Sequence, residues 1–270
     1  MMKRKSNIAI QHPEVWELLV SIDDGQMDYV LFTPTVANSL IFGNIGFSDL
    51  SMQGLEDAVY DTPELLNDYQ RVRIMVHSRH FVLLPEDTND DDCAMLVRQA
   101  FPDDDGDSAV SLVPTGGVKI AYLMPRGMLA FLGRTFNYPL ICHPLMPLCG
   151  YFKGMDKGDD TSRMFLHLGD GNMDLAIYRN GGLQCANSYP FTNAADAVFF
   201  ALSAWRAHAM DQLSDEVQFS GIGEQSTEVA AMLREYVKNV MPAAFPAAAM
   251  QLGRHAMQAP LDLVLLALCE

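Results

Sequence analysis

One tight turn, Gly169-Asp170-Gly171, contains the glycines of this sequence that best suit a role in binding a ligand. They lie in the stretch FLHLGDGNMDLAIYRNGGL (165–183), whose apolar runs predict two antiparallel strands joined at this turn and a third strand after the next turn. Glycine lets backbone amides approach an anion closely, so such a turn can hold a phosphate group. It can equally serve only to reverse the chain, and the rest of the sequence must decide between these uses.

An internal repeat supplies a second turn of the same kind. The segment LLVSIDDGQMDYVLF (18–32) aligns with MFLHLGDGNMDLAIY (164–178), and two later segments follow in the same order: DAVY (57–60) with DAVF (196–199), and RVRIMVHS (71–78) with EVQFSGIG (216–223). The matched positions around the turns are Asp24, Gly25, Met27 and Asp28 with Asp170, Gly171, Met173 and Asp174. Two unrelated hairpins with a common turn dipeptide are the alternative, but the ordered later matches favour a duplication.

Each half is predicted to run β-β-β-α-β-α, with three antiparallel strands followed by helix, strand and helix. That order makes an α/β protein with mixed sheets and helices on their faces. We expect a first lobe over residues 1–160, which contains an inserted segment over about 103–153, and a second lobe over 161–270.

The inserted segment has no counterpart in the second half. Its apolar runs predict a hairpin (109–125), a helix (126–136) and a strand (138–143). Pro144, Pro147 and Gly150 then predict a break in regular structure, and the polar stretch 153–163 a linker.

Two facing halves that each open with a glycine hairpin resemble the ribonuclease H-like superfamily of actin, sugar kinases and heat-shock chaperones, which implies an actin-like ATPase fold. In that superfamily the hairpins hold the nucleotide phosphates from opposite sides, and a glycine turn in the second half packs on the adenosine. The resemblance therefore implies ATP and Mg²⁺ as cofactors, with these candidate binding residues: Asp23, Asp24, Gly25, His167, Gly169, Asp170, Gly171, Gly221 and Gly223. It makes Asp23 the candidate carboxylate for Mg²⁺.

The motifs also depart from the superfamily pattern. His167 stands where an acidic residue belongs, Asp170 where glycine is usual, Met173 lacks a hydroxyl, and Ile222 separates two glycines that are usually adjacent. His167 can order a water or a phosphate oxygen, or it can be a buried strand histidine with a structural role. These departures disfavour ATP hydrolysis and leave it open whether the protein is an enzyme.

Nearly the whole chain is similar to an uncharacterised bacterial family, a domain of unknown function with an actin-like ATPase fold. The similarity rests on LLVSIDDGQMDYVLF, HLGDGNMDLAIYRNG and the C-terminal PLDLVLLALCE, which predicts a terminal helix docked on the body. It implies the fold, a possible nucleotide and no established reaction. Because some actin-like relatives are cytoplasmic adaptors, the alternative is a non-catalytic interaction module with an unknown protein partner, which would bind through residues 241–257 or 109–150.

Composition narrows the classes further. The chain has 270 residues with 49% hydrophobic and 19% charged, which is typical of a globular protein. A formal net charge of −16 argues against nucleic acid as a partner, and no apolar stretch is long enough to predict a membrane span. Five scattered cysteines are typical of reduced thiols, so we expect a soluble cytoplasmic protein, whose oligomeric state the sequence leaves open.

Other motifs carry little signal. His77 and His80 are three residues apart, but no nearby cysteine or carboxylate completes a metal site, and we interpret them as surface histidines at a turn. DDDGD (103–107) lacks the glutamate that closes a calcium loop. No GxxxxGK[ST] or GxSxG motif is present, which removes P-loop and hydrolase-elbow functions.

Overall fold

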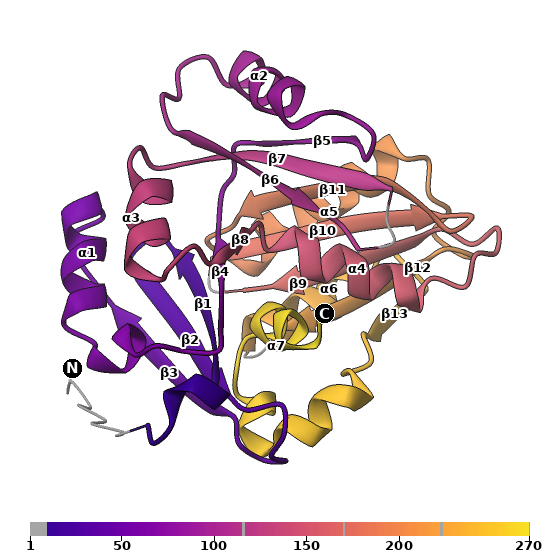
Figure 1. Ribbon diagram of the computed structural model, residues 1–270. Coiled ribbons are helices and arrows are strands. Elements are labelled where there is room, and N and C mark those ends of the chain that lie inside the picture. Colours follow the sequence, from indigo (N-terminus) through magenta and orange to yellow (C-terminus); the bar gives the residue numbers. More distant parts are fainter. Residues whose placement is uncertain (1–9, 115–116, 170, 222–223, 270) are drawn as a thin grey trace.

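Two five-stranded sheets and one three-stranded sheet organise the chain. The computed structural model describes residues 10–114, 117–169, 171–221 and 224–269. In Figure 1 the sheet of the first half lies at the left, that of the second half at the right, and the small third sheet lies above them. The C-terminal helix sits between the two large sheets.

The sheet of the first lobe has the strand order β3-β2-β1-β4-β8. Its strands are β1 (Glu17–Asp23), β2 (Gln26–Phe32), β3 (Ile41–Gly46), β4 (Arg71–Val76) and β8 (Leu140–Cys142). The first three strands form an antiparallel meander, whereas β4 runs parallel to β1 and β8 runs parallel to β4. The central strand β1 is buried almost throughout, which is the environment that its apolar run ELLVSID suits.

The second lobe repeats this topology in the order β11-β10-β9-β12-β13. Its strands are β9 (Arg163–Leu168), β10 (Asn172–Arg179), β11 (Gly182–Pro190), β12 (Glu216–Gly221) and β13 (Asn239–Pro242). Again the first three are antiparallel, and β12 and β13 continue the sheet in parallel. The predicted duplicated α/β fold with mixed sheets is therefore confirmed.

Helices connect and cover these sheets, and side chains cap several of them. Ser51, Asn89 and Asn193 each accept a hydrogen bond from a backbone amide in the first turn of the helix that follows. The helices are α1 (Met52–Tyr60), α2 (Asp90–Ala100), α3 (Met128–Thr135), α4 (Leu145–Met155), α5 (Ala194–Ala207), α6 (Glu224–Leu233) and α7 (Leu261–Leu268). Short 3-10 helices span Pro13–Val15, Pro63–Leu66, Ala247–Leu252 and Arg254–Met257.

The third sheet is the part of the first lobe without a counterpart. It has the order β5-β7-β6, is covered by α2, and consists of β5 (Phe81–Pro85), β6 (Asp107–Leu112) and β7 (Val118–Met124). It begins at β5, upstream of the expected start of the insert near residue 103. In the second lobe α6 precedes the last strand of the sheet, β13. The corresponding helix of the first lobe is α3, which precedes β8. The lobe boundary at residue 160 stays a prediction.

Helix α4 lies where the sequence predicted a break. Pro147 and Gly150 are both inside it, and five of its six buried positions up to Phe152 cluster in its first five residues, Leu145 to Cys149. Proline is tolerated there because the amides of a first helical turn have no intrahelical partner. Burial of an apolar face against the lobe core then outweighs the low helix propensity of glycine.

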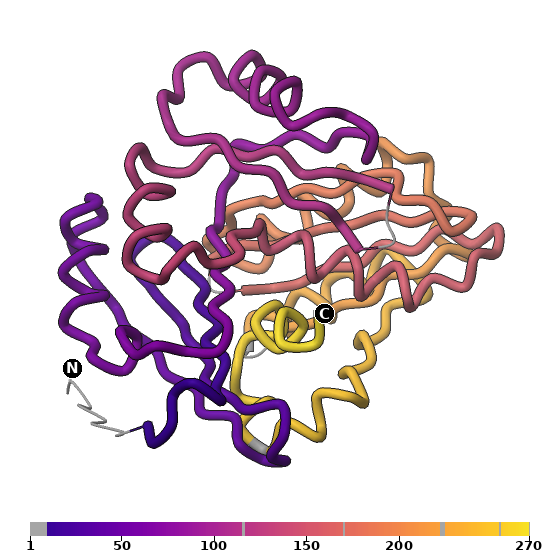
Figure 2. The backbone as a smooth tube through the Cα atoms, in the orientation of Figure 1, coloured from indigo at the N-terminus to yellow at the C-terminus, as the bar shows by residue number. Residues whose placement is uncertain are grey.

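The C-terminal segment leaves the second lobe and returns to the first. Figure 2 shows it running from β13 to the loop before β3, where the amides of Asn38 and Leu40 donate to the carbonyl oxygens of Gln251 and Leu252. Helix α7 then packs on β1 and α4 and joins the first lobe's core. The segment therefore crosses from one lobe to the other. Among the described residues, no helix combines the length and apolar character that crossing a membrane requires.

Candidate functional site

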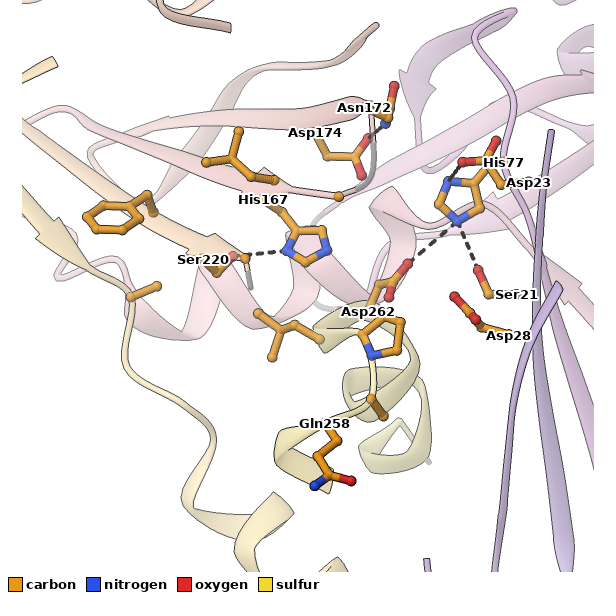
Figure 3. Close-up of a pocket in the computed structure, with 18 of the residues that line it drawn as sticks. Ser21, Asp23, Asp28, His77, His167, Asn172, Asp174, Ser220, Gln258 and Asp262 are labelled. Carbon is orange, nitrogen blue, oxygen red and sulfur yellow. Dashed lines mark hydrogen bonds and ion pairs between the residues drawn. The ribbon is translucent and has the colours of Figure 1, made fainter. Parts of the chain in front are cut away.

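A cleft of about 930 Å³ lies where the two lobes and the C-terminal segment meet. Its walls come from both glycine hairpins, from the ends of β4 and β12, and from residues 242–245 and 257–262. Figure 3 shows the polar residues of its floor. The repeat thus brings its two hairpins to one cavity.

The sequence-predicted binding residues divide into three groups. Those that line the cleft are Asp23, Asp24, His167, Gly169 and Gly221. The glycines at the two hairpin tips, Gly25 and Gly171, are not among the described lining residues. Asp170 and Gly223 lie outside the described residues.

In each hairpin the amide that precedes the tip already has a hydrogen bond within the hairpin, or lies next to one that does. The Asp24 amide donates to Oδ1 of Asp23 at 2.8 Å, and the Gly169 amide donates to the carbonyl oxygen of Asn172 at 2.8 Å. The tip glycines have φ values of +75° and +76°, in the left-handed region that glycine adopts without strain. The amides of Asp24 and Gly169 are therefore not free to bind a phosphate.

Gly221 is required by packing alone. It has φ +135°, and a Cβ at this position would lie 2.4 Å from the carbonyl oxygen of Leu168 on the neighbouring strand. Glycine permits this close approach of β12 to β9, so its presence does not by itself indicate an adenosine site.

His167 projects from β9 into the cleft. It is 6% exposed and lies between Asp174 on β10 and Ser220 on β12. Its Nδ1 is 3.1 Å from Oγ of Ser220, whose hydroxyl donates to the carbonyl oxygen of Leu166 at 3.3 Å. With the Ser220 hydroxyl donating to Leu166, Nδ1 of His167 is the donor to Ser220, and Nε2, which is an acceptor in this tautomer, faces the cleft (Figure 3).

The interpretation of His77 as a surface histidine is wrong, because its side chain is 19% exposed and lines the cleft. It follows β4, and its Nε2 lies 2.9 Å from Oγ of Ser21 and 3.6 Å from Asp262, while Nδ1 lies 3.8 Å from Asp23 (Figure 3). Burial lowers the pKa of His77, but the contact with Asp262 and the charges of Asp23 and Asp174 outweigh burial and raise it to about 9. His80, its neighbour in the motif, instead contacts Asp104 at 2.6 Å on the surface.

Ser21, His77 and Asp23 have the residue types of a serine-hydrolase triad. In such a triad the histidine must be neutral to take the serine proton. With a pKa of about 9, His77 is protonated at neutral pH and donates to Ser21. The arrangement therefore does not activate Ser21 as a nucleophile.

Two repeat-equivalent carboxylates, Asp28 and Asp174, complete the floor. Burial raises the pKa of both. Each is hydrogen-bonded by side chains of its own lobe: Gln26 and Asn44 donate to Asp28, and Asn172 and Ser188 donate to Asp174. The sequence paired these aspartates in the repeat without marking them as site residues.

The cleft as a whole does not fit a phosphate chain. Its described lining includes Asp23, Asp24, Asp28, Asp174 and Asp262 but no lysine or arginine. A carboxylate near a phosphate is unfavourable unless a metal ion offsets the repulsion. In the part of the chain that the structure describes, no group of three or more His, Cys, Asp or Glu side chains could hold such an ion.

The topology and the interlobe cleft define the class of this protein, an actin-like ATPase fold. A protein with actin-like ATPase fold and unknown function from Bacteroides thetaiotaomicron VPI-5482 superposes with a TM-score of 0.77 at 17% identity, over 96% of this chain and 97% of that one. The PilM-PilN type IV pilus biogenesis complex matches with a TM-score of 0.53 at 13% identity, over 95% of this chain and 98% of that one.

The sequence places the chain in a particular family within this class. A family model described as "Protein of unknown function (DUF3822)" matches residues 5–240, so the chain belongs to that family. The resemblance to such a family is thereby confirmed. No curated protein matches the sequence.

Proposed function

We propose that this protein is a non-catalytic binding module with an actin-like fold, and that the interlobe cleft is its binding site. The observation that carries the proposal is the cleft floor, which is polar and buried yet holds no activated group. His77 is protonated, Asp28 and Asp174 accept hydrogen bonds within their own lobes, and His167 replaces the acidic residue of ATPases.

An adaptor role is consistent with the fold. A solved structure similar to this chain is that of the PilM-PilN complex, so this architecture can serve as a component of a protein assembly. All five cysteines are free thiols, which supports the cytoplasm as the location. The partner of this protein would then be another protein or a smaller ligand that enters the cleft.

A second candidate function is the binding of an ATP–Mg²⁺ complex without turnover. It is favoured by one observation: hairpins related by the internal repeat line opposite walls of the same cleft. The occupied amides and the absence of lysine and arginine from the described lining weigh against it.

Thermal unfolding and phosphate release with ATP and Mg²⁺ test these functions together. A ligand present at a hundred times its Kd adds about 2.7 kcal/mol of stability, which corresponds to a rise in Tm of about 5 °C or more. We expect no such rise at millimolar Mg-ATP and no phosphate release above the buffer rate. A rise without release would establish the second candidate, and release that is lost in the Asp23→Asn variant would overturn the non-catalytic proposal.

A further inference from the structure

Several hydrogen-bond donors on the cleft floor already have partners within the protein. Four side-chain donors bond to the buried carboxylates, Gln26 and Asn44 to Asp28 and Asn172 and Ser188 to Asp174. His77 directs Nε2 at Ser21 and Asp262 and Nδ1 at Asp23. The carboxylates thus engage these donors, although each of the three amide groups keeps a second N–H.

Several acceptors remain open on the same floor. Both donors to Asp174 bond to its Oδ1, and no described residue donates to its Oδ2. Oδ2 of Asp262 is 3.6 Å from His77, an ion pair rather than a hydrogen bond, although this aspartate is only 3% exposed. In the tautomer whose ring proton is on Nδ1, Nε2 of His167 is a third acceptor, and it faces the cleft (Figure 3).

A floor with open, buried carboxylate oxygens and no lysine or arginine in its described lining favours a ligand that brings its own donors. A positively charged donor matches best, because charge-assisted hydrogen bonds to carboxylates are the strong ones. Burial raises the pKa of Asp262, but the interactions with His77 and His167 outweigh burial and lower it, so this carboxylate is charged at neutral pH.

The geometry distinguishes an organic cation from a bare metal ion. Magnesium and calcium need several oxygen ligands at about 2.0–2.6 Å around one point. The described residues contain no group of three or more acidic, histidine or cysteine side chains arranged in that way. Ammonium and guanidinium groups reach acceptors at about 2.7–2.9 Å and spread their donors over a wider span.

The remaining cleft wall is apolar. It is formed by β12, the end of β13 and the C-terminal segment, through Phe219, Pro242, Ala244, Phe245, Met257 and Leu261. An aliphatic or aromatic stem can bury its surface there while its charged head reaches the floor.

We infer that the cleft binds an organic cation, with an ammonium or guanidinium head on Asp174, Asp262 and Nε2 of His167 and an apolar stem along the 242–245 wall. This inference rests on the proposed binding function. The same chemistry can come from a free amine or from a lysine or arginine side chain of a partner peptide.

Calorimetry and thermal unfolding with defined probes test the inference. The probes are hexylamine, agmatine, and acetylated, amidated pentapeptides with one central arginine or lysine; hexanol and the corresponding glutamine peptide are their uncharged controls. We expect at least one cationic probe to bind and raise Tm, the uncharged controls to fail, and binding to weaken with salt. Tighter binding of the small amines indicates a metabolite, and tighter binding of the peptides indicates a protein partner.

Matched variants locate the binding. Asp174→Asn and Asp262→Asn should each weaken the bound probe about tenfold or more, since each removes a carboxylate oxygen that accepts from the ligand. Asp91→Asn makes the same charge change on the exposed face of α2 and should leave affinity unchanged. Circular dichroism and Tm of each variant show whether it is folded, and His167→Gln, which keeps an acceptor, provides a second test if either aspartate variant fails to fold.

Two results would overturn the inference: no cationic probe binds the wild type, or binding is equal in the wild type and the folded aspartate variants. If the probes fail while Mg-ATP is neither bound nor hydrolysed, the proposed non-catalytic function stands and only the cation inference falls. Turnover of ATP would instead remove the proposed function itself.

Discussion

The two lobes contain the same kind of buried charge pair with its sides exchanged. In the first lobe Glu17 on β1 accepts a hydrogen bond from Arg73 on β4. In the second lobe the arginine is on the central strand, where Arg163 of β9 lies 3.1 Å from Glu216 of β12. Because β1 corresponds to β9 and β4 to β12, the duplicated fold retains an ion pair between these strands without specifying which one carries the positive charge.

The exchange gives each arginine a different second role. Arg73 also donates to the carbonyl oxygens of Leu266 and Cys269, and so it fastens the C-terminal end of α7 to the first lobe. Arg163 also binds Asp156 at 3.0 Å and Asp159 at 2.7 Å, in the segment that joins the lobes. A similar exchange occurs in the cleft. In the first lobe Ser21 on β1 contacts His77, which follows β4, whereas in the second lobe the histidine, His167, is on β9 and contacts Ser220 on β12. Topology is shared between the lobes, whereas polar contacts are particular to each.

The largest effect is expected from Arg163→Met. The side chain is only 1% exposed and pairs with three carboxylates, of which Asp156 is fully buried, so its loss leaves that buried charge without a partner. Removing one member of a buried ion pair costs about 3–5 kcal/mol. We expect the free energy of unfolding, measured by urea denaturation, to fall by that amount.

Arg126→Met is the matched control for this prediction. Arg126 contacts Asp105 at 3.2 Å, but both side chains are more than three-quarters exposed, at 76% and 82%. Exposed pairs contribute little, so the change should be below about 1 kcal/mol. Equal losses in the two variants would show that the network around Arg163 does not stabilise the second lobe.

Arg73→Met should have a somewhat smaller effect on stability, about 2–4 kcal/mol, since a single carboxylate loses its partner. Its local signature should be distinctive. Without Arg73 the last turn of α7 loses two hydrogen bonds, so amide hydrogen exchange over residues 261–268 should accelerate. When the two variants are compared at equal global stability, amide exchange in α7 should be faster in Arg73→Met than in Arg163→Met. Equal acceleration would contradict separate roles for the two arginines.

The next prediction concerns pH and two histidines, His77 in the cleft and the buried His143. His77 has a pKa raised to about 9, above its ordinary value of 6.5. Its contribution is therefore fully present below about pH 6.5 and is lost as pH rises through 9. We expect the free energy of unfolding to fall by about 2–3 kcal/mol over this range. The slope should disappear in His77→Gln, and His80→Gln, an exposed histidine, should retain it.

His143 predicts the opposite dependence. Burial lowers its pKa to about 3, and its ring lies against Phe81 and Tyr122. Its contribution is present above about pH 6.5 and is lost as pH falls toward 3. Urea denaturation in acid should therefore show a slope that His143→Gln reduces and His77→Gln leaves unchanged. A common slope in both variants would mean that the titration belongs to other groups.

The fold could be predicted from the sequence because its main signals are local patterns of neighbouring residues. The Asp-Gly turns and their apolar flanks predict hairpins, and the ordered repeat predicts two equivalent lobes, because both signals arise from neighbouring residues. The third sheet was harder to delimit. Its first strand, β5, pairs with β7 across α2 and β6, a pairing that no local periodicity reveals.

The site was less predictable for the same reason. Ser21 and His77 are 56 residues apart, and Asp262 joins them only because α7 returns to the first lobe. Taken alone, the motif around His77 is typical of a surface turn. The hairpin glycines could be identified from the sequence. The hydrogen bonds made by the neighbouring amides could not, because they depend on side-chain positions and strand register.

The smallest effect is expected from alanine at the two hairpin tips. Gly25 and Gly171 have nearly identical φ values of +75° and +76°, so backbone strain should cost about 1 kcal/mol or slightly more in either lobe. Their surroundings differ. A Cβ on Gly25 would lie 3.0 Å from the carbonyl oxygen of Phe47, whereas the nearest atom to a Cβ on Gly171 is 3.8 Å away. Gly25→Ala should therefore cost about 0.5–1 kcal/mol more than Gly171→Ala in urea denaturation.

Asparagine, which tolerates the left-handed region, should recover part of the loss at Gly171, where there is space for it, and less at Gly25. Equal losses would mean that backbone strain alone sets the cost and that the third strand of the first lobe moves aside.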